Sequence, residues 1–324
     1  MILYLHAGTH KTGTTAIQSF LYPHRDLLEE RGLYVPLAGL LGTPPEMGHH
    51  NIAFELGGRQ MDPAAGGLDA LVAELAERAP ERAVVSSENF YPLSSDPDAL
   101  RLLRDRTEAI GVRIRPILYF RPQAMLLEAL YVEFVKHGMT EPFDAFLDEA
   151  LENGAVTYNE ATYDVDYDRV VASFADVFGR DAMIVRPYEN APRAEDFIAQ
   201  FLGLLVPEAG DLDLTELGAW ERRNLSVGFR AVASNLYANR SVEGDPAFED
   251  VLDELMRDKR EAPEALLRPH GRYWDGKFEP LGVDDLARLY ARFGDGNRIL
   301  RATYGIEVPV CPPSRLFDEV RARR

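Results

Sequence analysis

Cysteine and long apolar runs are scarce in this chain of 324 residues. Cys311 is the single cysteine, which excludes a framework of disulfide bonds within the chain. No apolar run reaches the roughly 18 residues that a membrane helix needs. The N-terminus has neither the basic start nor the A-x-A-like cleavage site of a signal peptide. We therefore expect a cytoplasmic protein without stable membrane insertion.

Positive charge is also in short supply. The chain has 35 Lys and Arg residues against 53 Asp and Glu, which gives a formal net charge of −18. Such a surface repels nucleic acid and anionic membranes, so we expect neither as a partner. It also repels any anionic ligand, which must then be held by local groups. Lysine is the rarest of the basic residues and occurs at positions 11, 136, 259 and 277.

The first residues have the pattern of a strand, a glycine-bounded loop and a helix. Residues 2–5 are a short apolar run that suits a buried strand. Gly8 and Gly13 flank a tight loop, and residues 16, 17, 20 and 21 place apolar side chains on one helix face. The backbone N–H groups of such a loop point inward, and the helix dipole adds partial positive charge. This segment is expected to bind an anion.

The loop matches G-x-x-x-x-G, but it differs from the site that binds ATP or GTP. A Walker loop carries a lysine directly after the second glycine. Here Thr14 stands at that place, Lys11 lies two residues before Gly13, and Thr15 keeps the hydroxyl position. The lysine therefore approaches the anion from the other side of the loop. The alternative is an ordinary strand-to-helix turn in which threonines cap the helix.

Strands and helices alternate up to about residue 190, and helices follow. This order indicates an α/β fold, a P-loop-like parallel sheet flanked by helices, with a helical C-terminal half. We expect one domain over 1–324, with an α/β core over 1–190 and a helical part over 191–324 packed on it. The expected strands are 2–5, 33–36, 83–87, 114–120 and 182–186. The expected helices are 17–30, 68–79, 97–110, 122–137, 143–153, 167–178, 194–205, 226–240, 246–260, 284–293 and 297–304.

Polar groups follow three of the expected strands. The anion loop follows the strand at 2–5, Glu88 the strand at 83–87 and Arg121 the strand at 114–120. Ligands of open α/β sheets bind at the carboxyl ends of strands, so these groups are expected at one edge. Residues 38–67 are rich in glycine and proline and are expected to form a long irregular segment. We expect this segment to border the acceptor site.

The segment G-T-H-K-T-G-T-T at 8–15 resembles the 5′-phosphosulfate loop of bacterial sulfotransferases. The resemblance implies a transferase that uses 3′-phosphoadenosine 5′-phosphosulfate as donor and releases adenosine 3′,5′-bisphosphate. It implies donor contacts from His10, Lys11, Thr12, Gly13, Thr14 and Thr15, and a catalytic role for Lys11. Arg121 is similar to the arginine that holds the 3′-phosphate, although Ala129 replaces the serine that the family usually adds.

The resemblance also implies a general base, for which the sequence offers two candidates. Glu88 follows the strand at 83–87, where the family carries His or Glu, and apolar neighbours at 84, 85 and 90 would desolvate it. The alternative interpretation is that the Glu88 carboxylate caps a helix or pairs with an arginine. His50, next to His49, is the rival base, because imidazole titrates near neutrality. Adjacent histidines point apart and no carboxylate pair or cysteine joins them, so no metal site is expected.

Two further segments resemble the family more loosely. Gly271 and Arg272 match the loop that closes over the nucleotide in carbohydrate sulfotransferases. Arg222 and Asn224 precede an expected helix at a place where bacterial relatives often carry N-x-S. We assign Arg222 and Asn224, with His49 and His50, to the acceptor side. The resemblance implies that the acceptor is a hydroxyl of a carbohydrate, lipid or small metabolite, and the sequence does not distinguish among these. The alternatives are a P-loop kinase or NTPase, and a non-catalytic nucleotide-binding relative; the oligomeric state stays open.

Overall fold

A computed structural model describes residues 1–9, 12–159, 161–188, 194–206, 228–241, 250–251 and 278–313. The chain divides into two compact units. One comprises Met1–Phe120 with Tyr167–Arg223, and the other comprises Arg121–Asp166 with Asn224–Arg324. The expected single domain with a core over 1–190 stays a prediction. Both units draw on segments from the two halves of the chain.

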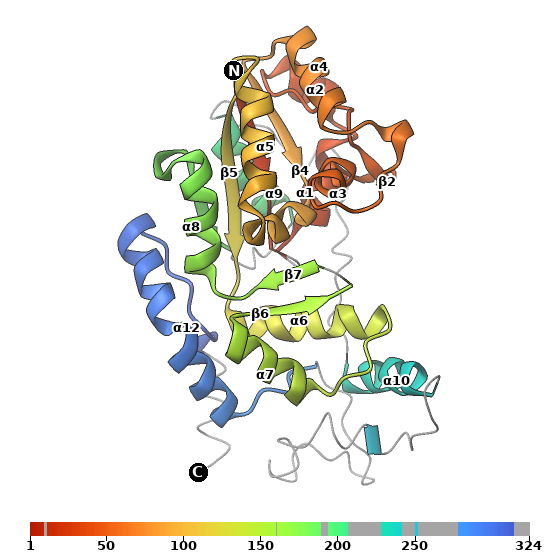
Figure 1. Ribbon diagram of the computed structural model, residues 1–324, viewed down its shortest axis with the longest axis vertical. Helices are drawn as coiled ribbons and strands as arrows, with labels where there is room; N and C mark the ends of the chain where they lie inside the picture. The colour runs from red at the N-terminus through yellow and green to blue at the C-terminus, as the bar shows by residue number, and fades with distance from the viewer. Residues whose placement is uncertain are drawn as a thin grey trace. The chain divides into compact units, whose positions relative to one another are not determined.

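The first unit is built on a parallel sheet with the strand order β4-β1-β5-β8 (Figure 1). Its strands are β1 (Ile2–His6), β4 (Arg82–Ser86), β5 (Arg113–Phe120) and β8 (Ile184–Pro187). Its helices include α1 (Thr14–Leu21), α2 (Arg25–Glu30), α3 (His50–Leu56), α4 (Leu68–Arg78), α5 (Pro97–Glu108), α8 (Tyr167–Phe178) and α9 (Ala194–Leu205). The α/β class with a parallel sheet flanked by helices is confirmed.

Alternation along β5 assigns helices to the two faces of the sheet. Tyr119 packs in a buried cluster with Ile17 of α1 and Phe201 of α9. The next residue, Phe120, stacks on Tyr167 of α8 with ring centroids 4.2 Å apart. Successive side chains of a strand point to opposite faces, so α1 and α9 cover one face and α8 covers the other. Burial on both faces explains the continuous apolar runs in β1 and β4.

The central position of β1 determines which loops meet. His6, its last residue, pairs with Ser86 of β4 on one side and with Ile117 of β5 on the other. Because β1 and β4 run parallel and end at the same level, the segments that follow them start side by side. The loop after β1 therefore adjoins the segment that begins with Ser87 and Glu88.

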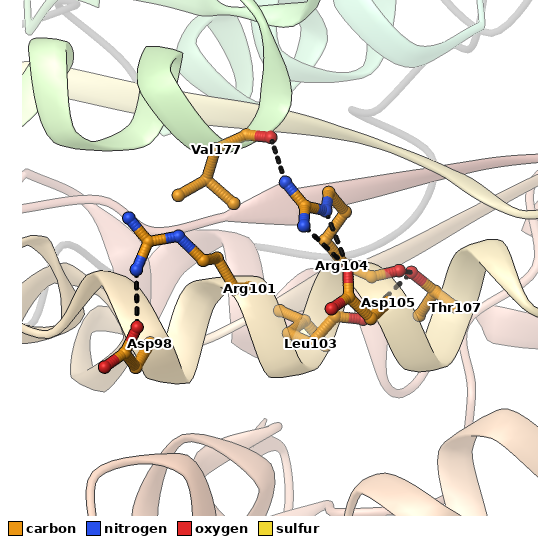
Figure 2. A network of polar contacts seen from close by, with 7 residues as sticks. All are labelled: Asp98, Arg101, Leu103, Arg104, Asp105, Thr107 and Val177. Atoms are coloured by element: carbon orange, nitrogen blue, oxygen red, sulfur yellow. Dashed lines mark hydrogen bonds and ion pairs between the residues drawn. The ribbon is translucent and has the colours of Figure 1, made fainter.

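Polar contacts on the surface of α5 reach the neighbouring helix α8 (Figure 2). Arg104 donates a hydrogen bond of 3.2 Å to the carbonyl oxygen of Val177 and pairs with Asp105 at 2.7 Å. Arg101 pairs with Asp98 one turn earlier. Exposed ion pairs of this kind contribute about 1 kcal/mol or less each. The two helices are therefore held mainly by their buried apolar faces.

The helix expected over 17–30 is wrong as a single element. The structure has α1 and α2 there, separated by residues 22–24. Pro23 lies in this break and has no N–H to donate to the helix, although Tyr22 before it keeps helical backbone angles, with φ −65° and ψ −51°. The strand expected over 33–36 is reduced to one bridge, between Tyr34 and Ala83.

The irregular segment expected over 38–67 is also wrong, because much of it has regular structure. It contains a hairpin of β2 (Leu41–Thr43) and β3 (Glu46–Gly48), then α3 and the short helix η1 (Pro63–Ala65). Glycine and proline here form tight turns instead of a long loop. The last residue of the hairpin, Gly48, lies against Gln18 of α1: a Cβ added at Gly48 would come within 2.9 Å of Cδ of Gln18.

The second unit is mostly helical, with one hairpin that the sequence did not reveal. Its elements are α6 (Gln123–Lys136), α7 (Phe143–Asn153), β6 (Ala155–Tyr158), β7 (Ala161–Asp164), α10 (Phe229–Arg240) and α12 (Val283–Tyr304). A reciprocal pair of buried amides joins α6 to α12, since Gln123 and Asn297 exchange hydrogen bonds of 2.8 and 3.0 Å. The helical nature expected of the C-terminal half is confirmed by α9, α10 and α12.

The helices expected over 284–293 and 297–304 are one helix, α12. Two glycines, Gly294 and Gly296, suggested a break, since each costs a helix about 1 kcal/mol. The buried face continues through them, however, with Leu289, Phe293 and Leu300 on one side. Burial of this stripe outweighs the cost of the glycines. The helix expected over 246–260 lies almost entirely outside the described residues.

Candidate functional site

The loop between β1 and α1 has the geometry expected of an anion cradle. Gly13 is the N-cap of α1 and has left-handed backbone angles, with φ 79° and ψ 11°. A Cβ there would also lie 2.6 Å from the Phe197 ring of α9, so glycine is required for both reasons. No acidic residue occupies the first turn of α1. The free N–H groups and the dipole of this helix are therefore not neutralised by its own side chains.

Threonines hold the cradle in shape. Thr9 donates to the carbonyl oxygen of Tyr119 in β5 at 3.0 Å, and Thr12 donates to the carbonyl oxygen of Thr9 at 2.6 Å. The hydroxyl proton of Thr12 is thus used within the loop, which leaves its backbone N–H as the group for a ligand. Thr15 is exposed on the first turn of α1. Thr14 is 4% exposed, and its Oγ1 has no hydrogen-bond partner.

His6 lies beneath the cradle, and the sequence analysis did not identify it. Its ring is fully buried, and Nδ1 lies 2.8 Å from Oγ of Ser86. Burial lowers the pKa of His6 to about 4, while the nearby charge of Glu88 acts in the opposite direction. The ring is therefore neutral near pH 7. Its Nε2 is buried and has no hydrogen-bond partner.

Glu88 is joined to the helix that forms the cradle. It starts the short helix η2 (Glu88–Ser95), whose N-cap Ser87 accepts a hydrogen bond from the N–H of Asn89. Gln18 of α1 donates from Nε2 to Oε2 of Glu88 at 3.0 Å, and Gln18 itself is 4% exposed. The structure thus places Glu88 next to α1, the helix that follows the anion loop. One carboxylate oxygen is oriented by a neutral amide.

His49 is occupied by main-chain contacts. It is 1% exposed, Nδ1 accepts from the N–H of Ser86 at 3.1 Å, and Nε2 lies 3.0 Å from the carbonyl oxygen of Pro36. Burial lowers its pKa to about 4. These bonds leave neither ring nitrogen available to a substrate. We assign His49 to the support of the fold and do not carry it into the proposed function.

His50 is half-buried at the start of α3 and has a defined tautomer. Nδ1 lies 2.8 Å from Oγ of Ser87 and 3.1 Å from Nδ2 of Asn89. An amide nitrogen only donates, so Nδ1 accepts and Nε2 carries the proton. Nε2 also approaches Gly48, where an added Cβ would lie 2.5 Å away. In this state His50 offers a hydrogen bond to a ligand and has no free lone pair to act as a base.

The other predicted site residues are not assembled by the described structure. Arg121 directly follows Phe120, the last residue of β5, and is half-buried in the second unit; its contact with a 3′-phosphate stays a prediction. Six of the predicted residues lie outside the described residues: His10, Lys11, Arg222, Asn224, Gly271 and Arg272. Their roles stay predictions as well.

Two residues that sequence reasoning missed did leave a signal. His6 ends an apolar run two residues before the first loop glycine. A polar side chain on a buried strand is usually hydrogen-bonded, so its presence there indicates a specific partner. Gln18 lies four residues after Thr14, so both occupy the same face of α1. Nothing in the sequence shows that Ser86 pairs with His6, because that contact depends on strand order.

Metal and membrane sites were also considered within the described ranges. There, no cluster of three or more His, Cys, Asp or Glu side chains is arranged to hold a metal ion. None of the helices described combines the length and the apolar character needed to cross a membrane.

Comparison with known proteins does not assign a family. No model of a protein family matches the chain, and a search of curated proteins gives no match either. The arrangement itself offers three chemical capacities: an anion site at a helix N-terminus, a carboxylate oriented on the same helix, and a neutral imidazole N–H nearby.

Proposed function

We propose that this chain is a sulfotransferase that moves a sulfuryl group from 3′-phosphoadenosine 5′-phosphosulfate to an acceptor hydroxyl. The observation that carries the proposal is the shared use of α1. Its N-terminus is capped by Gly13 and has no acidic residue in its first turn, and its Gln18 holds Glu88 at 3.0 Å. Group transfer from an anionic donor to a hydroxyl needs an anion site next to a base. The loop sequence at 8–15 supports sulfate over triphosphate, since a threonine replaces the Walker lysine.

The reaction assigns one task to each group. The backbone N–H groups of residues 13–15 and the ammonium group of Lys11 hold the 5′-phosphate and the bridging oxygen. The acceptor oxygen attacks sulfur in line, and the bond between sulfur and the bridging oxygen breaks. Its electron pair goes to the 5′-phosphate, where Lys11 stabilises the developing charge. The acceptor proton goes to the carboxylate of Glu88. The products are the sulfated acceptor and adenosine 3′,5′-bisphosphate, and no step needs a metal.

Glu88 is preferred to His50 as the base in this scheme. The lone pair of His50 at Nδ1 is already used by Ser87 and Asn89, while a carboxylate retains several acceptor sites. His50 instead donates from Nε2 to the acceptor or to a sulfuryl oxygen. Arg121 binds the 3′-phosphate through its guanidinium group, which suits bidentate contacts.

Ligand-induced stabilisation tests the nucleotide class. Adenosine 3′,5′-bisphosphate at about 100 times its Kd stabilises the folded protein by about 2.7 kcal/mol, which thermal unfolding detects. ATP with magnesium is the comparison ligand. Stabilisation by ATP with magnesium, and none by the bisphosphate, would contradict the proposal and favour a P-loop kinase or NTPase.

A transfer assay then tests the chemistry. The purified protein is incubated with the donor and a panel of hydroxylated carbohydrates, lipids and small metabolites, and release of the bisphosphate is measured. Glu88→Gln keeps the size of the side chain but removes the base. We expect this variant to bind the bisphosphate and to lose turnover. A wild-type protein that binds the bisphosphate but sulfates none of a broad panel would favour a non-catalytic relative.

A further inference from the structure

Two buried polar atoms beneath the anion cradle have no partner among the described residues. Within the described part of the chain, Nε2 of His6 and Oγ1 of Thr14 are both without a hydrogen bond, although their residues are 0% and 4% exposed. Leaving a buried donor or acceptor unpaired costs about 1–3 kcal/mol. Two such atoms in one place therefore need an explanation, and neither is explained by the fold.

The two atoms converge on the first glycine of the loop. A Cβ added at Gly8 would lie 2.9 Å from Nε2 of His6, 3.1 Å from Oγ1 of Thr14 and 3.2 Å from Oγ1 of Thr12. The absence of a side chain at Gly8 thus leaves one space that all three polar atoms border, although Nε2 of His6 and Oγ1 of Thr14 make no hydrogen bond to each other. Thr12 has already donated its proton to Thr9. The hydroxyl proton of Thr14 is the one that is still available to a ligand.

The His6 ring is held in a single orientation by its surroundings. Its centroid lies 5.8 Å from that of Tyr119, edge to face, and 5.1 Å from that of Phe201. Oγ of Ser86 contacts Nδ1 at 2.8 Å. If Ser86 donates to Nδ1, the single proton of the neutral ring is on Nε2, directed at the cradle. The ring then joins β4 to the first turn of α1 without carrying a charge.

We propose that His6 is a positioning residue: when an oxyanion binds at the start of α1, Oγ1 of Thr14 turns to accept a hydrogen bond from Nε2 of His6, and the relay from Ser86 then directs the Thr14 hydroxyl at the anion. The order of donation in the bound state is Ser86 to Nδ1 of His6, Nε2–H to Oγ1 of Thr14, and Oγ1–H to the anion. Each donor in such a chain is polarised by the one before it. The relay rests on the proposed function for the identity of the anion, a phosphate or sulfate ester.

A mutant cycle on ligand affinity tests the coupling. The probe is adenosine 3′,5′-bisphosphate, measured by isothermal titration calorimetry. Thr14→Val removes the hydroxyl at nearly constant shape, and we expect affinity to fall about 10- to 100-fold. His6→Asn keeps a polar atom near Ser86 but lacks one at the position of Nε2, and should lower affinity about 10-fold. His6→Gln extends an amide to that position and should restore most of the loss.

The double variant separates a relay from independent effects. In the Thr14→Val background, His6→Asn should lower the affinity by less than a further factor of about three, because Thr14→Val has already interrupted the series of hydrogen bonds. The control double variant combines His6→Asn with Thr15→Val, which lies at an exposed position on the same turn of α1. Because Thr15 is not part of the relay, the two fold-losses in affinity should multiply. Full multiplication of the losses in the His6 and Thr14 pair would overturn the relay, as would failure of His6→Gln to restore affinity.

Nitrogen NMR provides a readout that does not depend on a variant's affinity. In the bound wild-type protein labelled with ¹⁵N-histidine, the relay requires His6 to carry its proton on Nε2; the signal is assigned by its loss in His6→Gln. A proton on Nδ1 would overturn it. If the bisphosphate does not bind, the proposed function fails, and the same cycle is run with inorganic phosphate. Binding of phosphate with the same coupling supports the relay, and no binding of either anion overturns it.

Discussion

Lowering the pH from about 7.5 to about 5 should destabilise this protein through two buried histidines. Burial lowers the pKa of both His6 and His49 to about 4, whereas an unfolded histidine titrates near 6.5. Between these pKa values, the two histidines are therefore protonated in the unfolded chain and neutral in the folded protein. A lowered pKa in the folded state means that stability is complete above about pH 6.5 and is lost as the pH falls toward 4.

The magnitude follows from the size of the two shifts. At about pH 5 the unfolded imidazole is mostly protonated and the folded one is mostly neutral, so each histidine costs about 2 kcal/mol. Together they account for about 4 kcal/mol between pH 7.5 and 5. The slope that each histidine contributes is steepest between the two pKa values, where it approaches about 1.4 kcal/mol per pH unit, and it is small above about pH 7. His6 is opposed in part by the charge of Glu88, which raises its pKa.

Urea denaturation at several pH values measures this slope. The free energy of unfolding of wild-type protein is compared with that of His49→Gln and of His6→Asn, each over the same pH range. Between about pH 6 and 5 each variant should lose about 1.2 kcal/mol per pH unit from the slope, whatever its stability at neutral pH. His137→Gln, at an exposed position, provides the comparison for replacing a surface histidine. Slopes in the two buried variants that equal the wild-type slope would refute the reasoning.

Three further predictions concern the site and the second unit. Lys11→Ala should lower turnover by at least about 100-fold; a variant with near-wild-type turnover would remove Lys11 from the mechanism. Gln18→Leu should lower turnover about tenfold, because Glu88 loses its orienting donor, while titration calorimetry shows bisphosphate affinity within about twofold; weaker binding with intact turnover would contradict this role. Asn297→Ala should cost about 2–3 kcal/mol in urea denaturation, and combining it with Gln123→Ala should cost less than the sum of the single changes.

Local patterns predicted the main elements of the fold well. The strands at 2–5, 83–87 and 114–120 and the helix at 167–178 appear nearly as expected, because apolar runs and helical periodicity are properties of neighbouring residues. The failures lie where local signals conflict with packing. Glycines inside α12 suggested a break, but the buried stripe through Phe293 carries the helix across them.

Sequence and structure say different things about the candidate site. The motif singles out the loop at 8–15, and the structure joins Glu88 to α1, the helix that follows this loop. The sequence offered His49 and His50 as a pair, but burial and main-chain bonds separate them: His49 supports the fold, while His50 is half-buried. The sequence alone does not show which of two adjacent histidines faces the core.

The sequence by itself determined the glycine-bounded loop, the replacement of the Walker lysine by Thr14 and the alternation that demands a parallel sheet. Tertiary structure alone decided the strand order β4-β1-β5-β8, and with it the contacts of His6 with Ser86 and of Gln18 with Glu88. These partners are separated by 80 and 70 positions. Such pairs form only when burial of whole strands and helices selects one arrangement of the chain, since no local preference acts over that distance.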